Sequence, residues 1–325
     1  MDKIYKVMGE RSFLLLLLFG VIIVAVGYFR PASPDPLKRN LWKSDRFWTY
    51  KTHCVWEADM IVAGNSRVYR GVSPEVLQKY LPGLKIFNFG YSSGGLNPFV
   101  YKEIDKRLNP RSTNRIILLG VDPHCLSDDA AKNGHILKEL KRSREDIYSR
   151  VYFSEYLRWF EPLTIAQPRP KSLYFEEFHE DGFIGSWTEP ANPRDYIQRW
   201  EKLILAGKYR CEKKLVDAMV AQIAAWTKSG VKVLAFRPPV PRDVWELEDR
   251  GLKFDTAEII KKIEAAGGIW INTEPGAWAT YDGSHLTKQE ALRFSDYLGQ
   301  EIKSRLTVPL SAPAKVCAVP PPAGR

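Results

Sequence analysis

Short apolar runs followed by a glycine recur in the first half of the chain. Such runs occupy residues 59–63 (DMIVA), 84–89 (LKIFNF) and 115–119 (RIILL), and stretches with helical apolar spacing separate them at 74–80 and 97–108. An apolar run of this length that stops at a glycine is typical of a buried strand. The resulting β-α-β-α-β order predicts a parallel sheet covered by helices.

The same alternation returns towards the C-terminus. Two further helix–strand pairs are predicted, at 212–228 with 231–236 and at 259–266 with 269–272. Thr287 then stands three residues before Glu290 and forms a capping box for an amphipathic helix that reaches about Leu306. We therefore expect one α/β domain over residues 59–306.

Two segments break this alternation. Residues 128–205 are charged, aromatic and aperiodic, and we expect them to form a helical insertion that lies over the sheet. Residues 307–325 form a tail rich in proline and alanine, for which we expect disorder.

An apolar run at 13–29 points to a membrane. Its 17 residues carry no charge, are flanked by Arg11 and Arg30, and are just enough to cross a bilayer. The apolar region of a removable signal peptide is usually shorter, ~7–15 residues, so an uncleaved transmembrane anchor is favoured. Residues 1–12 are then a short cytoplasmic segment.

Residues 30–58 begin with prolines and continue with aromatic and basic residues, and we interpret them as a stalk. Its aromatic side chains are expected at the lipid headgroups: Trp42, Phe47, Trp48 and Tyr50. Basic residues on both sides of the span leave its orientation open. Because a signal anchor usually exports the polypeptide C-terminal to it, we expect a single-pass protein of the cell membrane with residues 30–325 outside the cytoplasm, periplasmic in a Gram-negative cell.

Composition narrows the class of protein but not its partner. The chain has 325 residues, 45% hydrophobic and 26% charged, which excludes a collagen, a disordered chain and a polytopic membrane protein. Its net charge of +10 favours anionic surroundings without choosing among them. There is no P-loop, no GxGxxG motif and no CxxC or Cys/His cluster, so we expect no nucleotide cofactor and no metal. The aromatic and basic residues at 42–50 suit lipid headgroups better than nucleic acid, so we expect no nucleic-acid partner.

Polar residues that could catalyse a reaction come directly after the predicted strands. In open parallel sheets, ligands bind beyond the carboxyl ends of the strands, so these positions are candidates for a site. Ser66 lies on the turn after the first strand (AGNSR), where it suits a nucleophile or, alternatively, a cap for the next helix. After the second strand, the Gly90 N–H could be presented to an oxyanion, and Asn88 suits stabilisation of the turn.

A carboxylate and an imidazole share the turn before the last helix. Asp282 precedes His285 by three residues (DGSH), so the carboxylate can fix the tautomer of the ring while the ring takes a proton from a serine. An ordinary solvated Asp-Gly turn is the alternative.

In this order, the blocks G-N-S, N-x-G-x-x-x-G and D-x-x-H resemble the SGNH/GDSL hydrolase superfamily over residues 59–306. The resemblance implies a three-layer α/β/α, flavodoxin-like fold with a parallel sheet. It implies Ser66 as nucleophile, His285 as general base and Asp282 as the residue that orients the base. It also implies that the backbone N–H groups of Ser66 and Gly90 form the oxyanion hole.

One block departs from that pattern. The third block of the superfamily usually reads G-x-N-D and gives an asparagine side chain to the oxyanion hole, whereas this chain reads GVDPH at 120–124. An ionised Asp122 cannot donate a hydrogen bond. Either the hole has two donors, or His124 or a protonated Asp122 substitutes, or the activity is low.

Several further residues are possible substrate-binding groups. Arg67 beside the serine and Arg237 after the strand at 231–236 could clamp a phosphate or a carboxylate, with solvated positions as the alternative. Asn88, Asp122 and His124 are the other candidates.

An N-terminal anchor, a short stalk and a serine soon after it resemble membrane-anchored members of the superfamily, such as the D-alanyl-lipoteichoic-acid biosynthesis and exopolysaccharide acetylation proteins. The resemblance implies an esterase or O-acyltransferase that acts on acyl groups of a cell-surface glycan or polymer, with a membrane-bound O-acyltransferase as a possible partner. A catalytically inactive glycan-binding or assembly subunit is the alternative.

Overall fold

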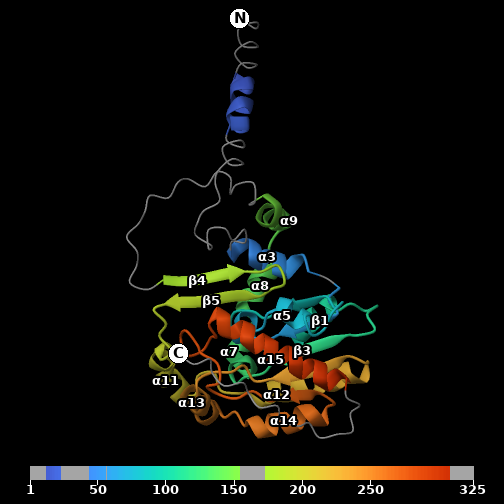
Figure 1. Cartoon of the computed structure of the whole chain (residues 1–325), viewed down its shortest axis with the longest axis vertical. Helices are drawn as coiled ribbons and strands as arrows, with labels where there is room; N and C mark the ends of the chain where they lie inside the picture. The colour runs from blue at the N-terminus through green and yellow to red at the C-terminus, as the bar shows by residue number, and fades with distance from the viewer. Residues whose placement is uncertain (1–11, 23–43, 56, 154–172, 308–325) are drawn as a thin grey trace, which may run out of the picture.

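The computed structural model describes residues 12–22, 44–55, 57–153 and 173–307 (Figure 1). Within these residues, the central sheet contains five parallel strands in the order β2-β1-β3-β6-β7. The strands are β1 (Met60–Ala63), β2 (Ile86–Asn88), β3 (Ile116–Gly120), β6 (Lys232–Phe236) and β7 (Ile269–Ile271). In chain order this arrangement is 2-1-3-4-5, the flavodoxin-like topology. The predicted parallel α/β sheet is therefore confirmed, with the strand ends shifted by one or two residues.

Helices cover both faces of the sheet because successive strand residues point to opposite sides. Met60 and Val62 pack with helices α4 (Ser66–Gly71), α5 (Pro74–Gln78) and α15 (Lys288–Thr307). Ile61 and Ala63 pack with α3 (Ser44–His53), α6 (Pro98–Arg107), α12 (Lys213–Lys228) and α14 (Thr256–Ala265). The result is the predicted three-layer α/β/α arrangement.

The stalk interpretation is wrong for helix α3, which is part of the domain. Phe47 is 1% exposed and packs on Trp48 and Phe178, so these aromatic rings lie in the protein core rather than at lipid headgroups. Lys51 is also buried, and its Nζ donates to the Gly182 carbonyl oxygen at 2.9 Å. Residues 30–43 of the expected stalk, with Trp42, lie outside the described residues.

The insertion at 128–205 is helical only in part. It contains α7 (Asp128–Ala131), α8 (Gly134–Leu140), α9 (Arg144–Tyr148), a π-helical turn η2 (Ser149–Phe153) and α11 (Asp195–Leu205). It also contains the antiparallel strands β4 (Leu173–Phe178) and β5 (Ile184–Glu189), which the expectation of an all-helical insertion missed.

The β4–β5 hairpin is fixed to the central sheet by its turn. The Asn88 N–H at the end of β2 donates to the Asp181 carbonyl oxygen at 2.8 Å. Within strand β4, Glu176 pairs with Arg70 of α4 at 2.8 Å. The hairpin thus lies against the edge of the sheet where β1 and β2 end.

Residues 12–22 near the N-terminus are helical, and large apolar side chains from Phe13 to Ile22 are exposed on this helix. Among the described residues, no helix has both the length and the hydropathy needed to span a bilayer. The rest of the expected anchor at 13–29, and the expected disordered tail beyond residue 307, lie outside the described residues.

Candidate active site

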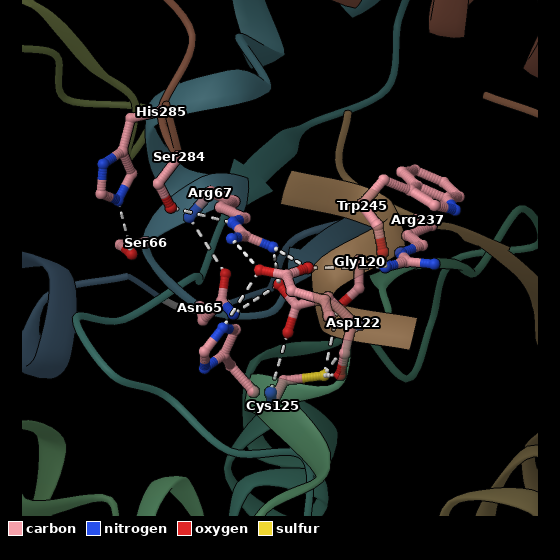
Figure 2. A network of polar contacts seen from close by, with 12 residues as sticks. Asn65, Ser66, Arg67, Gly120, Asp122, Cys125, Arg237, Trp245, Ser284 and His285 are labelled. Atoms are coloured by element: carbon pink, nitrogen blue, oxygen red, sulfur yellow. Dashed lines mark hydrogen bonds and ion pairs between the residues drawn. The ribbon is translucent and has the colours of Figure 1, made fainter. Parts of the chain in front are cut away.

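Two loops at the carboxyl edge of the sheet bring Ser66, Asp282 and His285 together, although 219 positions separate Ser66 from His285. Ser66 is the first residue of α4, just beyond β1, and the other two lie in the loop before α15. The Ser66 Oγ lies 2.8 Å from His285 Nε2 (Figure 2). On the other side of the ring, His285 Nδ1 lies 2.7 Å from Asp282 Oδ2. These contacts assign the ring proton to Nδ1 and leave Nε2 to accept the hydroxyl proton.

Asn65, not Ser66, caps helix α4. The Asn65 Oδ1 accepts a hydrogen bond from the Arg67 N–H at 3.0 Å, which satisfies one of the free donors at the helix start. The Ser66 hydroxyl is therefore not needed for capping and is directed to His285. The alternative that Ser66 serves as the cap is wrong.

The Asp282 carboxylate is held in its ionised form. Burial alone would raise its pKa, but the hydrogen bond and charge of His285 and two backbone N–H groups lower the pKa to about 2. Those N–H groups belong to Ser284 and His285, and both donate to Asp282 Oδ1. The carboxylate is thus charged at neutral pH and can stabilise an imidazolium beside it.

The His285 ring is held in its neutral form. Burial lowers its pKa below the ordinary value of 6.5; the bond to Asp282 opposes this, and the charges of Arg70 and Arg67 add to it. Tyr281 stacks on the ring, with centroids 5.8 Å apart. A neutral imidazole with a free Nε2 lone pair is what a general base needs at neutral pH.

Gly90, the oxyanion donor expected from the sequence, is not among the residues that line the pocket with Ser66. Its N–H donates to Asn88 Oδ1 at 3.0 Å, so it is already used within the turn. Ser93, three residues further along, lines the pocket next to Ser66, and its N–H has no acceptor among the described residues. Together with the Ser66 N–H, the Ser93 N–H is the better candidate for the oxyanion hole.

Asp122 is fully buried and acts as a hydrogen-bond acceptor. Its Oδ2 accepts from Asn65 Nδ2 at 2.7 Å, and its Oδ1 accepts from the Cys125 N–H at 2.9 Å. Asp122 is not among the residues that line the pocket. A protonated Asp122 therefore does not replace the missing asparagine donor, and Asp122 is not a substrate-binding residue.

The pocket that contains Ser66 and His285 has a volume of about 220 Å³. His124 lines it, as predicted for a substrate-binding residue, and its Nε2 contacts the hydroxyl of Tyr196 and, at 3.2 Å, the Glu248 carboxylate. Three aromatic side chains line the same pocket: Tyr196, Trp200 and Tyr209.

Two of the predicted substrate-binding residues lie away from the pocket. Arg237 is fully buried, binds Asp249 at 2.5 Å and stacks on Trp245, so it is not accessible to a substrate. Asn88 is also fully buried, and its Nδ2 donates to the carbonyl oxygens of Val68 and Val72. Its role is to stabilise the turn, the other use expected for it.

Arg67 lines the pocket, but its guanidinium binds protein oxygens. Nη2 lies 2.6 Å and Nη1 3.1 Å from the two oxygens of Glu248, and Nε donates to Ser284 Oγ at 3.1 Å. A role for Arg67 as a clamp for a substrate anion is therefore not favoured.

In the described ranges, no group of three His, Cys, Asp or Glu side chains is arranged to hold a metal ion. Cys54, Cys125 and Cys211 are free thiols, and Cys317 lies outside the described residues.

Several residues of this site were not predicted from the sequence. Ser93 has a positive φ of 51°, a conformation that the residue type does not indicate, although its loop was identified. Glu248 and the pocket aromatics lie in segments with ordinary amphipathic or aperiodic patterns, where an inward-facing acid or ring has no local signature. Only the positions in space of α11, the loop after it and α13 (Arg242–Leu252) reveal them.

None of the protein-family models matches the chain, and no curated protein matches it either. Among solved structures, the inhibitor-bound aryl esterase of M. Smegmatis is 14% identical, with 75% of this chain and 98% of that one covered and a TM-score of 0.32. A carbohydrate acetylesterase from Sinorhizobium meliloti is 11% identical, with 76% and 99% covered and a TM-score of 0.34. These likenesses are too distant to support conclusions about activity, which rest on the site geometry.

The lowered pKa of His285 predicts how the reactivity of Ser66 depends on pH. Phosphonylation of Ser66 by a fluorophosphonate should become faster as the pH rises through a value below 6.5 and should be constant from there to about pH 8, because only neutral His285 accepts the serine proton. The measurement is the labelling rate across this range. His179→Gln, which changes a histidine paired with Glu177 instead, should leave the profile in place. An acid limb centred above pH 7 would contradict the assignment.

The acceptor role of Asp122 predicts that restoring asparagine does not improve the site. In Asp122→Asn, the new NH₂ group would face either Asn65 Nδ2 or the Cys125 N–H, both donors. We expect a loss of about 1–3 kcal/mol in the free energy of unfolding and no faster labelling of Ser66. Urea unfolding and labelling rates measure both.

Asp105→Asn is the matched control for this substitution. The Asp105 carboxylate accepts from Trp226 Nε1 at 2.6 Å, and an asparagine oxygen can keep that bond, so stability should change little. Labelling of Asp122→Asn faster than wild type would show that residue 122 does reach the oxyanion.

Proposed function

We propose that this protein is a serine-dependent enzyme that transfers acyl groups from esters through an acyl-serine intermediate, as an SGNH-type hydrolase or O-acyltransferase. One observation carries the proposal: Ser66, neutral His285 and ionised Asp282 form a continuous hydrogen-bonded relay at the wall of a pocket. This is the arrangement that nucleophilic acyl transfer requires.

The relay performs the reaction in two halves. Ser66 Oγ attacks the ester carbonyl carbon while His285 Nε2 takes the hydroxyl proton, and the N–H groups of Ser66 and Ser93 stabilise the resulting oxyanion. The imidazolium then gives its proton to the leaving alcohol, and the acyl group stays on Ser66. An acceptor hydroxyl, activated by the same ring, attacks the acyl-serine and releases the serine.

The acceptor decides between the two activities. Water gives a carboxylic acid and makes the protein an esterase, whereas a sugar hydroxyl gives a new ester and makes it an O-acyltransferase. The residues of the relay serve both reactions equally. The pocket offers aromatic rings and polar groups such as Asp129 and Arg199, which suits a glycan or related polymer as the alcohol component.

A catalytically inactive binding subunit is the competing proposal. Its support is that Asp122 stands where the pattern of the SGNH superfamily has an asparagine. Asp122 has a role within the protein, as the acceptor for Asn65 and the Cys125 N–H, that is independent of the oxyanion. Ser66, neutral His285 and ionised Asp282 have the charges and the tautomer that catalysis needs. A subunit that only binds a glycan does not need such a relay. The enzyme is therefore the better proposal.

Ser66→Ala tests the enzyme directly. Because the nucleophile is lost, we expect hydrolysis of p-nitrophenyl acetate to fall at least about 10³-fold and fluorophosphonate labelling to disappear, with the Tm unchanged. Ser112→Ala, in an exposed loop, is the control and should keep both. Absence of labelling in folded wild-type protein would favour the inactive binding subunit, and product analysis with an oligosaccharide present would separate esterase from acyltransferase.

We further propose that the enzyme is anchored in the cell membrane by residues 13–29, with its domain outside the cytoplasm and a membrane-bound O-acyltransferase as its partner. The uncharged apolar run and its basic flanks support the anchor. A reporter fused after Arg325 should be active only on the outer side of the membrane. Reporter activity on the cytoplasmic side would show the opposite orientation and contradict this proposal.

A further inference from the structure

Glu248 is a fully buried carboxylate next to the pocket, on helix α13. Burial alone would raise its pKa, but the charge of Arg67 and the contact with His124 hold the pKa well below its usual range. Its two oxygens face Nη1 and Nη2 of Arg67 in a bidentate pair. Such a fork fixes both the position and the plane of the guanidinium.

The remaining edge of the same guanidinium reaches the histidine loop. Arg67 Nε donates to Ser284 Oγ at 3.1 Å, and both side chains are almost completely buried. Arg67 is the residue after Ser66, and Ser284 is the residue before His285 (Figure 2). One planar group thus connects the neighbour of the nucleophile to the neighbour of the base.

We propose that Arg67, oriented by Glu248, is a positioning residue that sets the distance from Ser66 Oγ to His285 Nε2 through its bond to Ser284. This inference rests on the proposed function, since it takes Ser66 as the nucleophile and His285 as the base. None of the three residues in this link touches the reacting atoms.

The two ends of the link belong to segments that are far apart in the chain. Ser66 is fixed to β1 and α4, whereas His285 is on a loop whose backbone bonds run to the α11 region, for example from the Tyr196 N–H to the Asp282 carbonyl oxygen. A link between the segments keeps the loop from drifting away from α4. A misplacement of about 1 Å between reacting groups can lower a rate about 10²-fold, so a small drift is enough to matter.

The test uses the Ser284 end of the link, because removing Glu248 would take from the buried Arg67 and Arg237 the carboxylate that they share and can prevent folding. Ser284→Ala deletes only the hydroxyl. We expect fluorophosphonate labelling of Ser66 and kcat for p-nitrophenyl acetate to fall about tenfold with KM close to wild type. The Tm should fall modestly, because the buried Arg67 Nε–H loses its acceptor. Arg67→Lys keeps the charge but loses the Nε–H, and it should slow both rates at least as much.

A double-mutant cycle tests whether Ser284 acts through Arg67. In the Arg67→Lys background, Ser284→Ala should cause no further loss, because the bond that it removes is already absent. Ser112→Ala is the matched control, since it also deletes one serine hydroxyl, which accepts from the Asn114 N–H in an exposed loop. It should leave both rates unchanged.

Each other outcome overturns the inference. If wild-type protein is labelled and Ser284→Ala is labelled equally fast, the proposed function stands and the positioning role fails. A lower Tm with an unchanged rate would show a merely structural serine, and additive losses in the double variant would show that Ser284 does not act through Arg67. If folded wild-type protein is not labelled at all, the proposed function itself fails, and the inference with it.

Discussion

The carboxyl ends of parallel strands meet at one edge of a sheet, and the whole candidate site depends on this constraint. Ser66 comes after β1, Asp122 after β3, and the loop of Asp282 and His285 after β7. The strands are short, but their side chains are buried on both faces, so the register of each strand is fixed by two layers of packing. Residues that are 219 positions apart can then share a hydrogen bond of 2.8 Å.

Four buried charged side chains form a network that begins with Arg67 at the pocket wall: Arg67, Asp122, Arg237 and Glu248. Two positive and two negative groups compensate one another, which makes their burial tolerable. Buried ion pairs add little net stability, because the loss of hydration offsets most of their attraction. Their directional contacts have a different effect: they fix where each side chain points, and the bidentate pair of Arg67 with Glu248 is the most directional of them.

The sequence predicted the sheet and the Ser66–His285–Asp282 cluster because both leave local signals. A strand buried on two faces is a short apolar run, and a turn at its end carries the residues that meet at the sheet edge. Helix α3 was misinterpreted because Phe47 and Trp48 have the same amphipathic pattern whether they pack on lipid or on protein. The choice of Asn65 over Ser66 as the cap was equally invisible, since both residue types are good caps and they stand next to each other.

Other features depend on contacts between distant segments. The position of Gly90 after a strand suits an oxyanion donor, but in the structure its N–H donates to the Asn88 side chain. Strands β4 and β5 were hidden because their pairing to each other, and the anchoring of their turn on β2, are long-range contacts.

The Asp122 departure fits the relay once its hydrogen bonds are considered together. Because Asn65 Nδ2 donates to the Asp122 carboxylate, the amide cannot flip, and its oxygen must face the Arg67 N–H. The cap of α4 is therefore held in one orientation, and the Ser66 hydroxyl is free to bond to His285. The carboxylate of Asp122 thus acts on the orientation of Ser66 through Asn65, because it fixes the start of helix α4.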